Sequence, residues 1–593
     1  GFIKSVSKAL KNGDKVAFVR NNNMYIKDLL SGEELQITFD GEYNSIINGA
    51  PDWVYEEEFG FSKGFQWSPD GQKIAYMRFD ESDVKMFNMT MYQGDRPALT
   101  QNKLYPDNHT FKYPKAGEDN SVVSIKVYDL NTKETVDMNV GEETDQYIPR
   151  IKWSKSPNTL SIIRVNRLQN VMELLFADAS TGESEVVYKD ENKYYISESN
   201  YDNIVFIDEN NFLITSERDG YMHIYSYNIE NKELTQITDG DWDVMSFDGY
   251  DAENQTVYYT ASDVTPTQTN LYSVKTNGKK LKKLNMQDGS NTAVYSEGHN
   301  YFINYFSNST TPNYVTLCDR NGKVIRVLED NKEYLEQVSE YKRTTREFFT
   351  FTTPNGDVLN GYMLKPVDFD ENKKYPVVMT QYSGPNSQSV IDEWSFDWYN
   401  YLSQEGFLVV CVDPRGTGAR GEEFRKCTYM QLGKYESEDQ IFAAEYLQTL
   451  PYVDGDNISI WGWSYGGFMV SLCMTKSDVF EAGVAIAPVT NWRYYDNIYT
   501  ERYMRTPQEN PDGYDDNSPI FHAEDLQGNL LLIHGTADDN VHFQNAIEFA
   551  EKLVQANVQF DFMCYNNRNH GIYGGNTSYH LYTKVVNFLK DNL

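Results

Sequence analysis

The distribution of apolar residues divides the chain into two parts with different periodicities. From residue 1 to about 335, short runs rich in Tyr, Val, Ile and Phe alternate with turn pairs such as Asn-Gly and Asp-Gly. Lys15–Val19, Lys73–Met77 and His223–Tyr227 are typical runs. The unit recurs roughly every 40 to 50 residues, which is the period of propeller blades. We therefore expect a β-propeller in residues 1–335, with an array of β-sandwiches as the alternative.

The second part, residues 336–593, has the pattern of an α/β domain. From Tyr375 onward, continuous apolar runs alternate with helical stretches, as a sheet covered on both faces requires. The expected strands are Val377–Thr380, Phe407–Val412, Ile458–Trp461, Gly483–Ala487, Leu530–Ile533 and Phe560–Met563. The expected helices are Ser437–Leu450, opened by a capping box of Ser437 and Gln440, then Phe543–Gln555 and Tyr579–Leu593.

Length and charge limit the classes of protein and partner. The chain of 593 residues is too long for one hydrophobic core. Its formal net charge of −34 argues against nucleic acid as a partner, because a polyanion would be repelled. No run approaches the ~18 to 20 uninterrupted apolar residues of a membrane span. We expect a large soluble protein with no membrane span in this chain.

The five cysteines are scattered and show no C-x-x-C spacing, so metal and redox motifs are not expected. Cys411, Cys473 and Cys564 lie in apolar segments and are expected to be buried free thiols, with a disulfide as the minor alternative. We expect neither a metal nor an organic cofactor. The chain begins with Gly1 and no signal-like segment, so either a leader has been removed or the chain has been cut.

Ser464 is the first candidate for catalysis. It lies in a G-x-S-x-G pentapeptide at the end of an apolar run, the pattern of a nucleophile elbow. Such a turn between strand and helix strains the serine backbone and needs very small neighbours, which Gly462, Gly466 and Gly467 supply. Backbone N–H groups nearby could then receive an oxyanion. The pentapeptide also occurs by chance, so partners are needed to support the assignment.

A serine hydroxyl needs a base that is oriented by a carboxylate, and in α/β hydrolases the order along the chain is Ser, acid, His. The loop after Leu530–Ile533 contains Asp538 and Asp539, and the residues alone leave both open as the acid. His570 lies on a polar loop after a strand and is the expected base. His580, at the start of the last helix, is the alternative.

These motifs together resemble the dipeptidyl peptidase IV branch of the prolyl oligopeptidase family, and the resemblance covers most of the chain. The segments that carry it are Asp52–Glu58, Gly462–Gly467, His534–Phe543 and His570–Ile572. The resemblance implies an eight-bladed propeller followed by an α/β-hydrolase domain. It places the nucleophile, acid and base on Ser464, Asp538 and His570.

The resemblance also implies an oxyanion hole and a small pocket. Tyr382 would complete the oxyanion hole with the backbone N–H of Tyr465, since a phenol is a suitable donor to a developing alkoxide. From the residues alone, a core tyrosine at a strand end is the alternative for Tyr382. An aromatic pocket suits the compact ring of proline, and its expected lining is Tyr465, Val489, Trp492, Tyr495, Tyr499 and Val541. Asn540 and Arg502 would lie near the carbonyl of the preceding residue.

Glu57 and Glu58 match a glutamate pair that holds the free amino terminus of a substrate. Two fixed carboxylates on a propeller loop can pair with one ammonium and leave two residues before the scissile bond. The alternative for these acids is a solvated loop.

We therefore expect a serine exopeptidase that releases Xaa-Pro, and less well Xaa-Ala, dipeptides from peptides through an acyl-enzyme. The alternatives are a tripeptidyl or acyl-aminoacyl peptidase on the same scaffold, and a catalytically silent propeller interaction module. The resemblance further implies a homodimer and a periplasmic or extracellular location. The first blade or two of the family's propeller, and an arginine there that contacts substrate, have no counterpart in this sequence.

Overall fold

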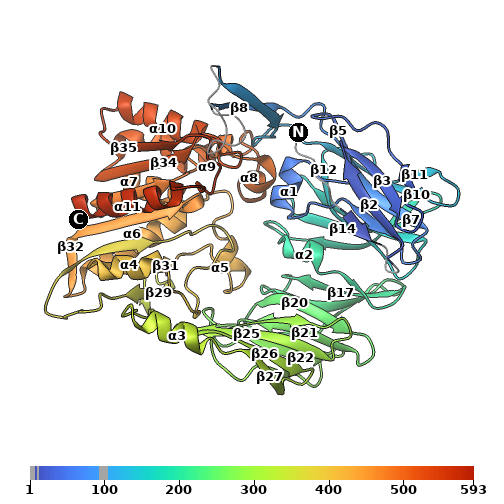
Figure 1. Ribbon diagram of the computed structural model, residues 1–593, viewed down its shortest axis with the longest axis horizontal. Coiled ribbons are helices and arrows are strands. Elements are labelled where there is room, and N and C mark those ends of the chain that lie inside the picture. The colour runs from blue at the N-terminus through green and yellow to red at the C-terminus, as the bar shows by residue number, and fades with distance from the viewer. Residues whose placement is uncertain (1–6, 10–12, 93–104) are drawn as a thin grey trace.

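The computed structural model describes residues 7–9, 13–92 and 105–593. Figure 1 shows separate sheets following one another along an arc, coloured from blue to green, with a layered α/β unit in orange and red on the opposite side. Among the described residues, no helix is long and apolar enough to cross a membrane.

The first part of the chain folds into successive antiparallel sheets. The first sheet contains β1 (Ser7–Ala9), β2 (Lys15–Arg20), β3 (Asn23–Asp28) and β4 (Glu34–Gln36). The second contains β5 (Ile46–Asn48), β6 (Phe65–Trp67), β7 (Lys73–Asp80), β10 (Val122–Asp129) and β11 (Thr135–Met138). The third contains β12 (Gln146–Trp153), β13 (Thr159–Asn166), β14 (Val171–Asp178) and β15 (Ser184–Glu191). The short helix α1 (Trp53–Glu58) lies between β5 and β6, and α2 (Ser199–Asp202) follows β15.

Three more sheets follow. The fourth sheet contains β16 (Val205–Phe206), β17 (Asn211–Ser216), β18 (His223–Asn228) and β19 (Glu233–Gln236). The fifth contains β20 (Val244–Asp251), β21 (Thr256–Ala261), β22 (Asn270–Lys275) and β23 (Lys282–Lys283). The sixth contains β24 (Ser290–Tyr295), β25 (Tyr301–Asn308), β26 (Thr311–Asp319) and β27 (Val324–Glu329). Neighbouring sheets meet through β3 and β5, β10 and β12, β18 and β20, and β20 and β24. This serial arrangement of separate small sheets fits the expected propeller.

One hairpin leaves the propeller and contacts the second part of the chain. It consists of β8 (Met86–Met91) and β9 (Asp107–Lys112). The Phe87 ring stacks on His542 with ring centroids 3.4 Å apart. Beyond β9, the Tyr113 hydroxyl donates to the carbonyl of Asn540 at 2.9 Å. The hairpin thus packs directly against the loop that carries Asp538.

The second part of the chain contains an eight-stranded sheet in the order β28-β29-β31-β30-β32-β33-β34-β35. From β31 to β35 the paired strands are parallel, whereas β28 and β29 are antiparallel to their neighbours. The strands are β28 (Glu347–Thr352), β29 (Val358–Leu364), β30 (Tyr375–Thr380), β31 (Leu408–Asp413), β32 (Val453–Trp463), β33 (Ala482–Ile486), β34 (Asn529–Gly535) and β35 (Asp561–Tyr565). All six expected strands are present.

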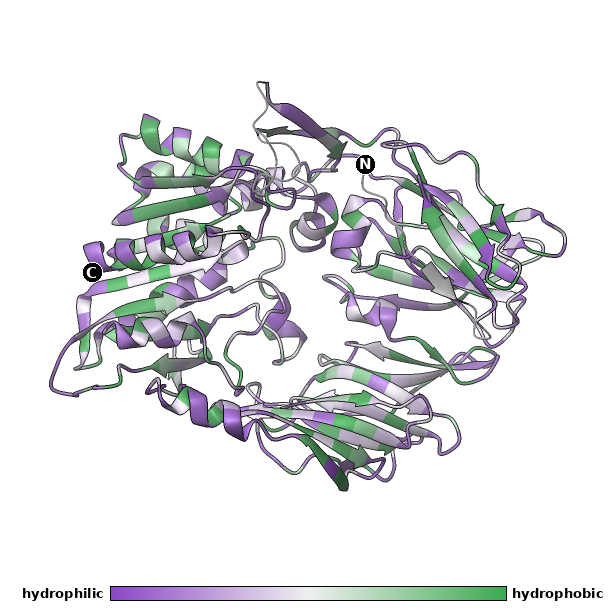
Figure 2. Ribbon diagram, in the orientation of Figure 1, coloured by the Kyte–Doolittle hydropathy of each residue, from purple (hydrophilic) through white to green (hydrophobic). Residues whose placement is uncertain are grey.

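Helices cover both faces of this sheet. One face packs against α6 (Lys434–Gln448), α7 (Tyr465–Lys476) and α10 (Gln544–Gln555), and the other against α4 (Trp398–Gln404) and α11 (Thr577–Asn592). The remaining helices are α3 (Lys332–Ser339), α5 (Glu422–Lys426), α8 (Asn497–Met504) and α9 (Pro511–Asp516). Figure 2 shows apolar residues gathered on the central strands, as the continuous apolar runs indicated.

Two details of the sequence prediction are wrong. Helix α6 begins at Lys434, not Ser437, and its first turn is closed by Glu436, whose carboxylate accepts from the N–H of Gly433 at 2.9 Å. Ser437 and Gln440 lie inside the helix and are buried, so they do not form the expected capping box.

Cys564 is exposed, whereas Cys411 and Cys473 are buried as expected. Its strand, β35, lies at the edge of the sheet, and most of that strand is only partly covered. An apolar neighbourhood in sequence therefore does not ensure burial on an edge strand.

A buried group of charges joins the two parts of the chain through α5. Lys426 on α5 is fully buried, and its ammonium lies 2.8 Å from Glu217 Oε2 of the propeller and donates to the Tyr195 carbonyl at 2.6 Å. Arg425 pairs with the same glutamate. Burial lowers the pKa of Lys426 to about 8.

Replacement of Glu217 tests this interface. In Glu217→Ala, two buried cations lose a shared partner, and we expect the free energy of unfolding to fall by about 3 to 5 kcal/mol. Urea unfolding monitored by tryptophan fluorescence would measure the change. The control is Glu423→Ala on α5, which removes an exposed ion pair between Glu423 and Lys193 of the propeller and should leave stability unchanged. Equal effects of the two substitutions would contradict the role of Glu217.

Candidate active site

Ser464 lies at the sharp turn between β32 and α7. Its backbone has φ 60° and ψ −118°, a strained conformation for a residue with a side chain. A Cβ on Gly462 or Gly466 would approach backbone atoms to within 2.5 or 2.7 Å, and one on Gly467 would lie 2.6 Å from the Ile486 carbonyl oxygen. These contacts explain why the three positions must be glycine, and they confirm the expected elbow geometry.

His570 and Asp538 form a hydrogen-bonded pair. His570 Nδ1 lies 2.7 Å from Asp538 Oδ2, and Asp538 is completely buried. Asp538 Oδ1 accepts from the N–H groups of Asn540 and Val541, each at 3.0 Å. The geometry therefore joins Asp538, and not Asp539, to the imidazole.

The neighbouring alternatives have other partners. The Asp539 carboxylate is hydrogen-bonded to Trp53 of α1. His580 Nδ1, in α11, lies 2.8 Å from the hydroxyl of Tyr565 at the end of β35. Both residues therefore have hydrogen-bond partners other than Asp538 and His570.

Electrostatics favour a charged Asp538 next to a basic His570. Burial alone would raise the pKa of Asp538, but the charge of His570 and hydrogen bonds from His534 and His570 lower it to about 2. Burial alone would lower the pKa of His570, but the charge and hydrogen bond of Asp538 outweigh this effect and raise it. The imidazole is thus a stronger base than an isolated histidine.

Backbone hydrogen bonds align the loops that carry these groups. The Trp463 indole, next to the serine, donates to the His570 carbonyl at 2.9 Å. The N–H of Ala537 donates to the Arg568 carbonyl at 3.0 Å, and the N–H of Asn567 to the Thr536 hydroxyl at 2.8 Å. Several of these residues lie inside the motif segments, but sequence reasoning gave none of them this positioning role.

Tyr382 and Tyr465 lie beside Ser464. The Tyr382 side chain is hydrogen-bonded to Ser464, and the partial loss of water around its hydroxyl and the nearby Glu58 raise the pKa of its phenol. Tyr382 is 40% exposed, so it is not a core residue. Tyr465 is the first residue of α7, and the helix does not use its N–H. A phenol and an N–H therefore lie close to the serine.

The side chain of Tyr465 is buried and forms a hydrogen bond with Glu436. Its hydroxyl donates to Glu436 Oε1 at 2.7 Å, and burial raises the pKa of Glu436 to about 7. This contact fixes the aromatic ring of Tyr465 at the wall of the expected pocket.

The aromatic residues of that expected pocket gather as a cluster of rings. Trp492 has ring centroids 5.7 Å from Tyr465 and 6.2 Å from both Tyr495 and Tyr499. Val489 and Val541 are buried in the same core. The Tyr495 hydroxyl donates to Asn540 Oδ1 at 2.8 Å, which joins the ring cluster to the Asp538 loop.

Glu57 and Glu58 are on a helix, not on the loop that we expected. They end α1, which begins after Asp52, whose carboxylate accepts from the Tyr55 N–H at 2.9 Å. Glu57 accepts from Asn540 Nδ2 at 2.6 Å. The structure thus brings the acids of the propeller to the Asp538 loop.

Arg502, on α8 of the hydrolase domain, lies near Glu58. Its guanidinium is buried, pairs with Glu198 and lies 4.0 Å from Glu58 Oε2. Its Nε donates to Gln169 at 2.8 Å. Glu198 is a neighbour that sequence reasoning missed, because it precedes α2 and belongs to no recognisable motif.

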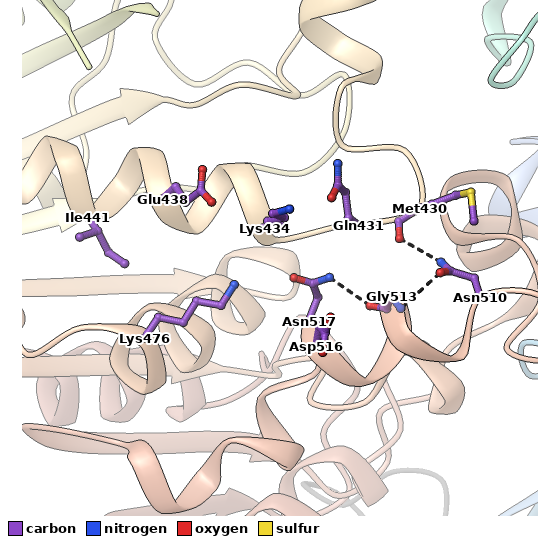
Figure 3. Close-up of a pocket in the computed structure, with 10 residues that line it drawn as sticks. All are labelled: Met430, Gln431, Lys434, Glu438, Ile441, Lys476, Asn510, Gly513, Asp516 and Asn517. Carbon is purple, nitrogen blue, oxygen red and sulfur yellow. Dashed lines mark hydrogen bonds between the residues drawn. The ribbon is translucent and has the colours of Figure 1, made fainter. Parts of the chain in front are cut away.

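A separate cavity of about 630 Å³ lies between α6 and α9. Figure 3 shows the amides of Asn510 and Asn517 hydrogen-bonded to neighbouring backbone in its wall. Its charged lining combines Lys434 and Lys476 with Glu438 and Asp516, and none of the expected site residues lines it.

The fold and the site together define a propeller protein with a serine hydrolase domain. Residues 5–313 match the family model of the dipeptidyl peptidase IV N-terminal region, and residues 394–593 match that of the prolyl oligopeptidase family. The chain belongs to the prolyl oligopeptidase family, in its dipeptidyl peptidase IV branch.

Solved structures and curated relatives agree with this membership. The crystal structure of Porphyromonas gingivalis dipeptidyl peptidase 4 is similar with a TM-score of 0.95 and 44% identity, covering 99% of this chain and 82% of that one. A putative dipeptidyl aminopeptidase IV from Bacteroides ovatus has a TM-score of 0.89 and 30% identity, covering 100% and 84%. The probable dipeptidyl-aminopeptidase B of Trichophyton verrucosum is 35% identical over 591 residues, 94% of this chain but only 65% of that relative's length.

The Asp538–His570 pair predicts a pH dependence. The base must be neutral, and Asp538 raises the His570 pKa, so kcat/KM should rise with pH through a midpoint above about 6.5. In Asp538→Asn the raising charge is lost, and the midpoint should move to lower pH while kcat falls by about 10⁴. Profiles of hydrolysis rate against pH for both proteins measure this. An unmoved midpoint would contradict the assignment of His570 as the base.

Proposed function

We propose that this protein removes dipeptides from the amino terminus of peptides with Pro, or less well Ala, in the second position. The observation that carries the proposal is the 2.6 Å hydrogen bond between Asn540 and Glu57. Asn540 also donates its N–H to Asp538, so the propeller acids are held at a set distance from the Asp538–His570 pair. Two carboxylates held in this way can bind an ammonium and measure two residues to the serine.

The proposed reaction begins with attack of Ser464 Oγ on the carbonyl carbon of the second residue. His570 Nε2 accepts the hydroxyl proton, while Asp538 holds the imidazole and stabilises its positive charge. The Tyr382 hydroxyl and the Tyr465 N–H receive the oxyanion. His570 then protonates the departing amine, and water, activated by His570, hydrolyses the acyl-enzyme.

The ring cluster supports the choice of substrate. Trp492, Tyr495 and Tyr499 are rigid aromatic side chains packed against one another, and an apolar pyrrolidine ring is a compact match for such a surface. The Ala methyl group would fit the same place with less apolar contact.

The relatives also support the proposal. The matched structure from Porphyromonas gingivalis is of a dipeptidyl peptidase 4, and the matched fungal relatives are named probable dipeptidyl-aminopeptidases. An eight-bladed propeller, a homodimer and a periplasmic or extracellular location are proposals supported by the family resemblance alone.

The activity can be tested with reporter peptides. We expect release of p-nitroaniline from Gly-Pro-p-nitroanilide, no turnover by Ser464→Ala, and a loss of kcat/KM of at least about 100-fold in Glu57→Ala/Glu58→Ala, because charge-assisted hydrogen bonds to the ammonium are lost. Faster release from Ala-Ala-Pro-p-nitroanilide would indicate a tripeptidyl peptidase instead. If neither reporter is cleaved, the protein is a propeller module without this activity.

A further inference from the structure

A second histidine contacts the acid of the proposed catalytic centre. His534 lies near the end of β34, and its side chain and that of Asp538 are completely buried. His534 Nε2 lies 2.8 Å from the carbonyl oxygen of Val541 and 3.2 Å from Asp538 Oδ2. The same Oδ2 lies 2.7 Å from His570 Nδ1. Two imidazole rings therefore meet at one carboxylate oxygen.

The neighbours of His534 determine which of its ring nitrogens carries the hydrogen. The Val541 carbonyl and the ionised Asp538 carboxylate can only accept, so Nε2 carries the hydrogen and donates it. The carbonyl is the nearer acceptor and the carboxylate is the second one. Nδ1 is buried and has no hydrogen-bond partner among the described residues, so a second hydrogen there would be an unpaired buried donor. His534 is therefore neutral and acts on Asp538 as a dipole, not as a charge.

The shared N–H closes a ring of contacts around the loop after β34. The Val541 N–H donates to Asp538 Oδ1 at 3.0 Å, and the Val541 carbonyl accepts from His534. His534 Nε2 also contacts Asp538 Oδ2, which completes the ring. The N–H of Asn540 adds a further contact to Oδ1, and His570 adds one to Oδ2. Because both oxygens are held, the carboxylate cannot rotate without losing several of these contacts.

We propose that His534 is a positioning residue of the catalytic centre. Its shared N–H holds the Asp538 carboxylate in the plane that faces His570, and it weakens the negative charge that Oδ2 presents to the imidazole. The inference rests on the proposed roles of Ser464, Asp538 and His570, but not on the dipeptide specificity. His534 acts on the serine only through the acid and the base.

The other titratable groups near the acid and the base are the same whether His534 is present or replaced. Those that face Asp538 or His570 from the surrounding elements are Glu57 of α1, Tyr113 after β9, Asp539 and His542. The charges of Glu57 and Asp539 raise the pKa of His570. Burial raises the pKa of the Tyr113 phenol and lowers that of His542 well below its ordinary value, so both are neutral.

Loss of the His534 N–H should make His570 more basic. Without the dipole, Asp538 Oδ2 carries more negative charge and stabilises the charged imidazole more strongly, so the pKa of His570 should rise. At the same time the carboxylate is less firmly oriented, so proton transfer from the serine should slow. The two effects together distinguish an action through Asp538 from a general loss of structure.

Two substitutions of similar size separate the N–H from the ring. In His534→Gln, the side-chain amide can donate from about the position of Nε2, whereas the side chain of His534→Met has a similar length and no N–H. The readout is the rate at which an alkyl fluorophosphonate labels Ser464, since this probe requires no peptide specificity. Ser464 Oγ displaces fluoride from phosphorus, and His570 accepts the hydroxyl proton.

We expect the conservative variant His534→Gln to be labelled within about threefold of the rate of the unchanged protein, with the same pH midpoint. His534→Met should be labelled at least about tenfold more slowly, with its midpoint about half a pH unit higher. This direction is opposite to the one expected for Asp538→Asn. A midpoint does not depend on the fraction of protein that is folded, so partial misfolding cannot produce the difference.

A double variant tests whether His534 acts through the acid. In Asp538→Asn the carboxylate charge is absent, so adding His534→Met should cause no further movement of the midpoint. His534→Asn, whose amide is too short to reach Oδ2, replaces His534→Met in both experiments if the methionine variant does not fold.

The outcomes separate two failures. An unmoved midpoint in His534→Met, or equal effects of methionine and glutamine, would overturn the inference and leave the proposed function standing. The same midpoint movement in the Asp538→Asn background would also overturn it. If the fluorophosphonate does not label Ser464 in the unchanged protein, the proposed function fails, and the inference fails with it.

Discussion

The site depends on polar contacts that cross from the propeller to the hydrolase domain. Asn540 bonds to Glu57, Arg502 pairs with Glu198, and Arg167 lies 2.7 Å from Glu501 Oε2. Buried ion pairs lose hydration, so they are favourable only when their geometry is good. These contacts therefore fix the relative position of the two domains more than they stabilise the interface between them. The distance from the propeller acids to Ser464 is a consequence of this alignment.

Two buried acids of this site have opposite pKa shifts, and their partners explain the difference. Asp538 accepts hydrogen bonds from two backbone N–H groups and from histidine, so its charge is stabilised despite burial. Asp496 accepts one backbone N–H and faces further carboxylates, so burial dominates. The first environment suits a permanent anion, whereas the second disfavours the charged form of the carboxyl group.

Local patterns made part of this structure predictable. The glycines around Ser464 follow from the needs of a strand-to-helix turn, and the continuous apolar runs predicted the core strands. The residues placed the base at His570 but left the acid open between Asp538 and Asp539, and only the family resemblance chose Asp538. The surroundings of Glu58 were not predictable from the sequence, because tertiary packing brings Glu198 and Asp496 close to Glu58 from distant segments of the chain. The helix at Glu57 was missed because six residues show no helical periodicity, and Cys564 because strand position, not local hydropathy, determines its exposure.

The proposed function requires that the propeller acids recognise a free amino terminus. The most direct measurement compares kcat/KM for Gly-Pro-p-nitroanilide with that for its N-acetyl derivative, in the unmodified protein and in Glu57→Ala/Glu58→Ala. Acetylation removes the positive charge, and we expect a loss of about 100-fold or more that largely disappears in the double variant. Equal or faster cleavage of the acetylated peptide would contradict this role of the propeller acids, because it would show that cleavage after Pro needs no free amino terminus.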